Sequence, residues 1–154
     1  MSFAADSTVD VKAIDDTVGI ALTLTADDKN ITVNNLAANQ TVTMTNDKAN
    51  TIELADIALN LEDDTGLTDS MTVKLVAKTN TAQTLDLLTM DDASETLNLD
   101  VSGVTTTTVA TTLTSLIADG AKTINITGAG NFVTTLNQSG TNVTTLIDAS
   151  TATG

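Results

Sequence analysis

Residues 130–150 read GNFVTTLNQSGTNVTTLIDAS, and the run VTTL at positions 133–136 returns ten residues later at positions 143–146. Each copy is a short β-branched run bounded by Gly, Asn and Ser, which is the local pattern of a strand closed by a turn. Two copies at a fixed spacing indicate that one supersecondary unit is stacked along the chain.

A related pattern recurs through most of the chain: a polar residue, usually Thr, followed by an aliphatic, any and an aliphatic residue. Side chains alternate between the two faces of a strand, so each copy predicts a half-buried strand with one aliphatic face. With the C-terminal pair included, the sequence predicts about ten strands. The other copies lie at residues 21–24, 31–33, 41–44, 51–54, 72–75, 84–87, 96–99 and 123–126.

Two segments are also compatible with a helix, namely residues 52–61 and 109–118. The first fits two short strands equally well, and the Thr content of the second lowers its helix propensity. We therefore predict that the whole chain is all-β.

Two all-β architectures fit strands at this spacing: a parallel β-solenoid (β-helix) and a β-sandwich with Greek-key connections. The self-similar motif favours the solenoid, because equivalent coils stack on one another. With two strands and roughly 22 residues per coil, the chain would make about seven coils, a rod of roughly 30 Å at ~4.8 Å per coil. A length of 154 residues fits one core. We expect residues 1–154 to form a single β-repeat domain that is a segment of a longer protein.

The composition argues against several classes of function. The chain has 20 acidic and 6 basic residues and a net charge of −14, whereas binding to nucleic acid or to anionic membranes depends on Lys and Arg. It has no Cys, His, Trp or Tyr, which leaves no conventional catalytic triad, thiol nucleophile or His-based zinc site. No apolar run approaches the ~20 residues of a membrane-spanning helix. We therefore expect a protein that is not an enzyme.

Acidic residues occur in pairs in several predicted turns. In stacked coils these turns would lie above one another and gather carboxylates, which repel unless a hard cation such as Ca²⁺ lies between them. The competing interpretation is that the acidic turns are solvated and end the strands locally. The candidate calcium ligands are Asp27, Asp28, Asp47, Asp63, Asp64, Asp91 and Asp92.

The C-terminal part of the chain, from about residue 84, resembles a known kind of repeat. Residues 97–103 (LNLDVSG), 123–130 (TINITGAG) and 146–154 (LIDASTATG) are similar to the Thr/Asp/Gly-rich strand repeats of bacterial surface-layer (S-layer) proteins. Those proteins are exported by type I secretion and are associated with RTX repeats. Related repeats occur in large secreted adhesins.

The resemblance implies an extracellular β-solenoid at the cell surface that folds with calcium and associates with itself into a two-dimensional lattice. It also implies attachment to cell-surface polysaccharide through other parts of a parent protein. The Gly-rich calcium-binding nonapeptides of the family are missing here, so the candidate aspartates are carried over only as carboxylates in turns. The alternative that the resemblance leaves open is a stalk or ligand-binding module of a secreted adhesin.

Overall fold

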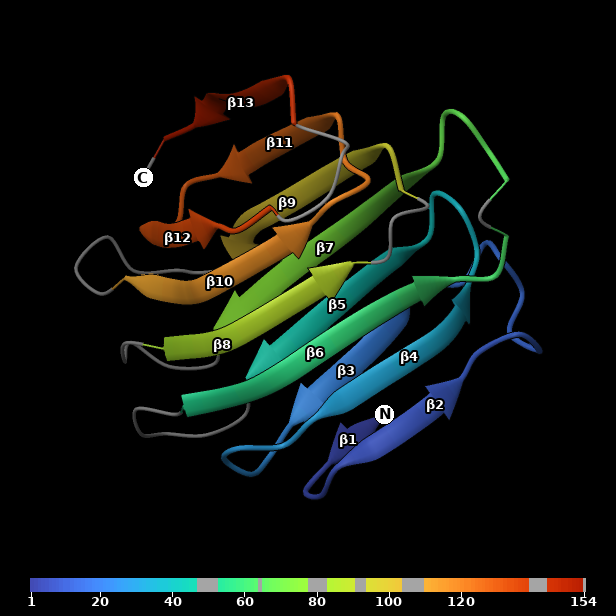
Figure 1. The fold of residues 1–154 in the computed structure, drawn as a ribbon. Coiled ribbons are helices and arrows are strands. Elements are labelled where there is room, and N and C mark those ends of the chain that lie inside the picture. Colours follow the sequence, from blue (N-terminus) through green and yellow to red (C-terminus); the bar gives the residue numbers. More distant parts are fainter. Residues whose placement is uncertain are drawn as a thin grey trace.

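Most of the predicted strand motifs form strands in the computed structural model, and successive strands alternate between two sheets (Figure 1). The structure describes residues 1–46, 53–63, 65–77, 83–90, 94–103, 110–138 and 144–153. Sheet A contains β1 (Ser2–Phe3), β3 (Ile20–Leu24), β5 (Thr41–Asn46), β7 (Ser70–Ala77), β9 (Thr96–Gly103), β11 (Thr123–Gly128) and β13 (Leu146–Ala152). Sheet B contains β2 (Ser7–Asp10), β4 (Ile31–Leu36), β6 (Glu53–Leu61), β8 (Gln83–Met90), β10 (Thr111–Ala118) and β12 (Phe132–Leu136).

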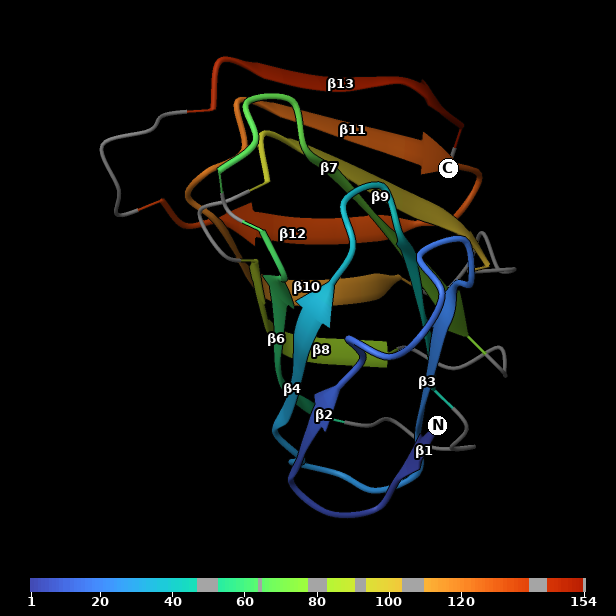
Figure 2. The ribbon, with the colours of Figure 1, turned by 90° about the vertical axis from the view of Figure 1, so that its right-hand side faces the viewer.

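Every strand pair in the described ranges is parallel, and each strand pairs with the strands two positions before and after it in the chain. One strand from each sheet therefore completes a coil, and the chain is a parallel β-solenoid, as predicted. The two sheets face each other, and β13 crosses the C-terminal end of the stack (Figure 2). The Greek-key sandwich is not the architecture of this chain.

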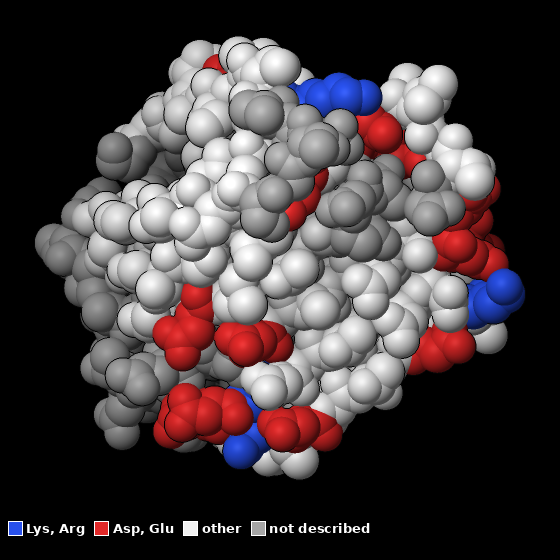
Figure 3. All heavy atoms as spheres, viewed as in Figure 1, with Lys and Arg blue, Asp and Glu red and all other residues white. Residues whose placement is uncertain are grey.

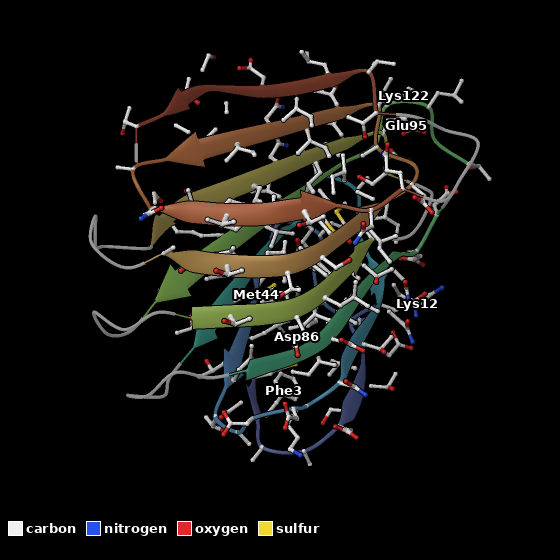
Figure 4. The ribbon with its side chains drawn as sticks, turned by 60° about the vertical axis from the view of Figure 1, so that its left-hand side comes forward. Phe3, Lys12, Met44, Asp86, Glu95 and Lys122 are labelled. Atoms are coloured by element: carbon white, nitrogen blue, oxygen red, sulfur yellow. The ribbon has the colours of Figure 1, made fainter. Side chains whose placement is uncertain are left out.

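The space between the sheets is filled by columns of aliphatic side chains. Val42, Val73 and Leu99 occupy paired positions on β5, β7 and β9, and each is 0% exposed. Figure 4 shows Met44 and Phe3 in the same interior, with Phe3 in the first coil. Because each column repeats similar branched side chains, neighbouring coils pack without large aromatic residues.

The coils are longer than the predicted value of roughly 22 residues, and their length is not constant. Thr8 pairs with Thr32, 24 residues later, whereas Thr41 pairs with Thr72, 31 residues later. The strands stay in register across this difference, so the corners between strands absorb the additional residues.

Asparagine side chains connect neighbouring coils on the outer faces. Asn60 Nδ2 donates to Asn34 Oδ1 at 2.7 Å in sheet B, and Asn125 Nδ2 donates to Asn98 Oδ1 at 2.8 Å in sheet A. All four side chains are half-buried. Each amide pair satisfies groups that the stacking of coils removes from water.

The segment 109–118 provides strand β10, and its helix-like spacing has a structural cause. Leu113 and Leu116 point inwards and are buried, whereas Thr114 is exposed and Ser115 is half-buried between them. Two consecutive residues therefore face away from the core, and the aliphatic spacing becomes three instead of two. The segment 52–61 contributes one strand, β6, which begins at Glu53. Leu54 and Ile57 of β6 are also three residues apart, and they pair with Leu85 and Leu88 of β8, the residues that pair with Leu113 and Leu116 on the other side of β8.

The ten-residue repeat is not a structural repeat, which corrects its interpretation as two equivalent strands. The first copy lies in β12 of sheet B, whereas the strand of the second copy begins only at Leu146, in sheet A. Thr144 precedes that strand and belongs to a corner, where its hydroxyl donates to the Ala121 carbonyl at 2.8 Å and its amide donates to Gln138 Oε1 at 3.1 Å. The true repeating unit is a pair of strands.

Candidate functional site

The predicted calcium ligands that the structure describes lie on two different edges of the solenoid. Asp27 and Asp28 lie between β3 and β4, where the chain passes from sheet A to sheet B; Asp63 follows β6, where the chain passes from sheet B to sheet A. These two connections are on opposite sides of the stack (Figure 1). The other predicted ligands, Asp47, Asp64, Asp91 and Asp92, lie outside the described residues. Asp63 is therefore not grouped with Asp27 and Asp28.

Asp63 instead lies in a groove with acidic residues from neighbouring corners. The groove has a volume of about 590 Å³, and Asp16, Glu62, Asp63 and Asp69 line it together with residues 36–38. We call it the acidic groove. Figure 3 shows that the acidic side chains visible from this direction lie mainly towards the rim.

Local contacts already engage several of the carboxylates along this edge. Lys12 Nζ lies 2.8 Å from Glu62 Oε1, and the Asp69 amide donates to Glu95 Oε2 at 2.9 Å. In Figure 4, Lys12 projects from the edge of the sheets, and Glu95 lies near Lys122 further along it. Within the described ranges, no three Asp or Glu side chains converge in a way that could hold a metal ion.

Asp15 and Asp63 form the same turn in two different coils. In each, one Oδ1 atom accepts hydrogen bonds from the amide and the hydroxyl of the Thr two residues later, at 2.9 and 2.6 Å. The hydrogen bond from the Thr17 hydroxyl is the largest cause that lowers the pKa of Asp15, and the hydrogen bond from the Thr17 amide lowers it further. The hydroxyl and the amide of Thr65 lower the pKa of Asp63 in the same way. The stabilisation from these carboxylates is therefore present above their unfolded pKa and is lost as pH falls through the folded pKa.

A second type of acidic turn was missed at the sequence level, although its residues fall in the segments that resemble S-layer repeats. The Ser102 amide donates to Asp100 Oδ1 at 2.8 Å, and the Ser150 amide donates to Asp148 Oδ1 at 2.8 Å. The strand pairing shifts by one residue beside each turn, so each Asp-x-Ser sequence supports a β-bulge in sheet A.

Burial raises the pKa of Asp100, but hydrogen bonds from Ser102 and the nearby Lys74 outweigh that effect, so the net pKa is lowered. For Asp148, the hydrogen bonds from Ser150 lower the pKa. Both carboxylates therefore stabilise a bulge in their charged form.

Strands β12 and β13 carry three of the large apolar side chains that are exposed in the described residues. Leu146 and Ile147 on β13 are 52% and 54% exposed, and Val133 on β12 is 52% exposed. Ile147 pairs with Ile124, which is buried in the interior. Ile147 thus continues an inward column, whereas Leu146 and Val133 pair with Thr123 and Thr112 and lie on the outer faces of sheets A and B.

A partly open cavity lies between β11, β12 and β13. Its volume is about 190 Å³, and its lining includes Ile126, Phe132, Ala149 and Ala152. Thr134 pairs with the buried Leu113, and its buried hydroxyl has no hydrogen-bond partner. A polar group in this position is destabilising unless something satisfies it.

Comparison with known protein families, curated proteins and solved structures gives no match for this chain. In the ranges that the structure describes, no helix has the length and apolar character needed to cross a membrane.

Proposed function

We propose that this chain is a structural, non-enzymatic segment of an extracellular cell-surface protein that associates with itself, as in an S-layer lattice. The observation that supports the proposal is the architecture of the described residues, a stack of parallel coils whose interior is filled by aliphatic side chains. Stacked repeats of this kind present extended surfaces along the stack, and repeat proteins use such surfaces to bind partners.

The high charge is compatible with this role. A net charge of −14 favours solubility of the separate copies and opposes indiscriminate aggregation. Association would therefore depend on a specific apolar contact. Salt would strengthen it, because at 0.1 M the repulsion between exposed charges more than about 10 Å apart is largely screened.

We expect sedimentation velocity at physiological salt to show a weight-average mass that rises above the 15.8 kDa monomer as the protein concentration increases. A weak contact would show this rise between about 1 μM and about 1 mM. Raising the salt concentration should shift the rise to lower protein concentrations. A mass that stays monomeric over this range would contradict self-association and would favour the adhesin-stalk alternative.

The proposal includes calcium as a stabilising ligand of the acidic corners, with Asp63 as the described candidate that lines a groove together with other acidic residues. About 10 mM Ca²⁺ is roughly 10 to 100 times the dissociation constant of a typical extracellular site. One site occupied at 100-fold excess adds about 2.7 kcal/mol, and we expect the midpoint of thermal unfolding to rise by roughly 5–10 °C relative to chelator.

Circular dichroism melts of the Asp63→Asn and Asp148→Asn variants separate a bound ion from general screening. If the ion binds in the acidic groove, Asp63→Asn should lose the calcium-dependent increase, whereas Asp148→Asn on sheet A should keep it. The same midpoint with calcium and with chelator in the unmodified chain would overturn the calcium part of the proposal and leave self-association standing.

A further inference from the structure

The strands of sheet A carry few charges for such an acidic chain, and those charges nearly cancel. In the described residues they contain three charged side chains, namely Lys74 on β7, Asp100 on β9 and Asp148 on β13. The strands of sheet B contain four acidic residues and no basic one in the same described ranges. Since the chain has a net charge of −14, a second copy is repelled least at the outer face of sheet A.

The outer face of sheet A is a regular array of mostly short side chains. The two sheets face each other (Figure 2), and no described strand lies over this outer face. Its outward residues are half-buried, as Thr41, Thr43 and Thr45 are on β5. Ala and Thr contribute methyl groups, so the face offers apolar contact as well as hydroxyl groups. One outward row crosses the sheet in register and contains Ala21, Thr43, Lys74, Asp100, Thr127 and Thr151.

Lys74 and Asp100 lie beside each other near the centre of this face. Their strands, β7 and β9, are the fourth and fifth of the seven strands in sheet A. Lys74 Nζ lies 3.5 Å from Asp100 Oδ2, and the two side chains are 38% and 27% exposed. An ammonium group has three donors and a carboxylate accepts several hydrogen bonds. This contact therefore leaves both groups able to bind a second partner of opposite charge.

A two-fold axis along the strands, midway between β7 and β9, would pair these groups across two copies. Because Lys74 and Asp100 are paired residues in the sheet, the rotation places Lys74 of each copy opposite Asp100 of the other. An axis on β7 would instead place two Lys74 side chains opposite each other, and an axis on β9 would do the same for Asp100. Asp148 would face β3, which has no charged residue. The charges therefore favour one register among those that the repeating strands allow.

The area of the face fits a weak interface between copies. Strands ~4.8 Å apart and roughly 17–20 Å long give sheet A an outer face of about 30 by 18 Å. Two such faces would bury on the order of 1,000 Å² in total, which is near the lower limit for a specific interface. A contact of this size suits association at protein concentrations between about 1 μM and about 1 mM.

We propose that two copies of this chain associate through the outer faces of sheet A, with Lys74 and Asp100 of each copy paired reciprocally across a two-fold axis. This inference names the contact surface of the proposed self-association and rests on that proposal. The interface is isologous, so each copy contributes the same face. The methyl groups of Thr and Ala residues supply the apolar contact, and the reciprocal ion pairs fix the register.

The first test compares Lys74→Glu with the matched control Lys12→Glu. Both variants make the same change in net charge and break an ion pair between coils, since Lys12 Nζ lies 2.8 Å from Glu62 Oε1 at the edge of the stack. Sedimentation equilibrium in chelator should show that Lys74→Glu weakens dimerisation at least about tenfold. Lys12→Glu should leave the dissociation constant within about twofold. Circular dichroism of both variants checks that they remain folded.

A mixture of two variants tests the reciprocal pairing itself. In a dimer of Asp100→Lys copies, Lys74 would face a second lysine, so this variant should also dimerise at least about tenfold more weakly. In a mixed dimer of Lys74→Glu with Asp100→Lys, every acidic side chain at these positions faces a basic one. The mixture should therefore form dimers at concentrations where each folded variant alone is monomeric.

Spin labels locate the interface without any change of charge, because the chain has no cysteine. Thr96→Cys lies at the start of β9 in sheet A, and Thr114→Cys is exposed on β10 in sheet B. Since packed sheets are ~10 Å apart, two Thr96 labels in the dimer should lie within about 20 Å, and two Thr114 labels more than about 30 Å apart.

Each outcome decides between arrangements. A short distance between Thr114 labels would place the contact on sheet B, and Thr96 labels about one stack length apart, roughly 30 Å, would indicate end-to-end stacking. Either result would overturn the sheet A dimer and leave the proposed self-association intact. The same holds if Lys74→Glu and Lys12→Glu dimerise equally well, or if the mixture of folded variants forms no dimer. A strictly monomeric chain would contradict both proposals.

Discussion

Replacing Leu97 by alanine is expected to lower the free energy of unfolding by about 3–5 kcal/mol, one of the two largest effects that we predict for single substitutions in this chain. Leu97 is 0% exposed on β9, in the middle of sheet A. It pairs with Met71 on β7 and with Ile124 on β11, which are themselves buried. The shortened side chain leaves a void in a column that is held from both sides, and the backbone ladders limit its collapse. Urea unfolding followed by circular dichroism measures the change.

The matched control is Leu67→Ala, which makes the same chemical change at a position that is 81% exposed. We expect this variant to stay within about 0.5 kcal/mol of the unmodified chain. Similar losses for both variants would contradict a continuous column through Leu97. If Leu97→Ala lowers the free energy of unfolding only slightly, the coils on either side close over the void.

The alternation of aliphatic and polar residues correctly predicted which side chains of a strand face the interior. In residues 96–99 the aliphatic positions are Leu97 and Leu99, and both are fully buried, while Asn98 between them faces outwards in an amide ladder. A strand has a two-residue period, and a solenoid buries one face of every strand in the same way. The parallel solenoid could therefore be predicted without any long-range information.

The pattern was ambiguous where a strand bends. Leu113 and Leu116 are three residues apart because Thr114 and Ser115 both face away from the core. A spacing of three is also the spacing of a helical face. The sequence alone does not show that a neighbouring strand, β8, has the same step at Leu85 and Leu88 and so keeps the two strands paired.

The grouping of acidic residues could not be predicted, because it depends on the lengths of the corners. Asp16 and Asp63 share the acidic groove although they belong to different coils, whereas Asp27 lies on the opposite edge. Corner length varies freely, since only the paired strand residues are in register. The bulges are a case in which a signal existed: Asp100 and Asp148 each precede a Ser by two residues, which is the spacing of a side chain that caps a local turn.

Replacing Gly128 by alanine is expected to lower the free energy of unfolding by about 3 kcal/mol, through two separate effects. Gly128 ends β11 with φ 106°, a conformation that residues with a side chain rarely adopt. An added Cβ would also lie 2.9 Å from the Val101 carbonyl carbon and still closer to the Ser102 amide nitrogen. Both atoms belong to the backbone of the bulge after Asp100, which cannot move without losing the hydrogen bond that closes that bulge.

Gly19→Ala separates these effects from the general loss of a glycine. Gly19 precedes β3, its φ lies outside the left-handed region, and an added Cβ would approach the Thr41 carbonyl oxygen only to 3.3 Å. Its expected change is below about 1 kcal/mol in either direction, because a compatible alanine also restricts the unfolded chain. Equal effects of the two variants in urea unfolding would contradict the close approach of β11 to the bulge on β9. A large loss for Gly128→Ala alone would support it, and with it the role of Asp-x-Ser turns in setting how tightly successive coils stack.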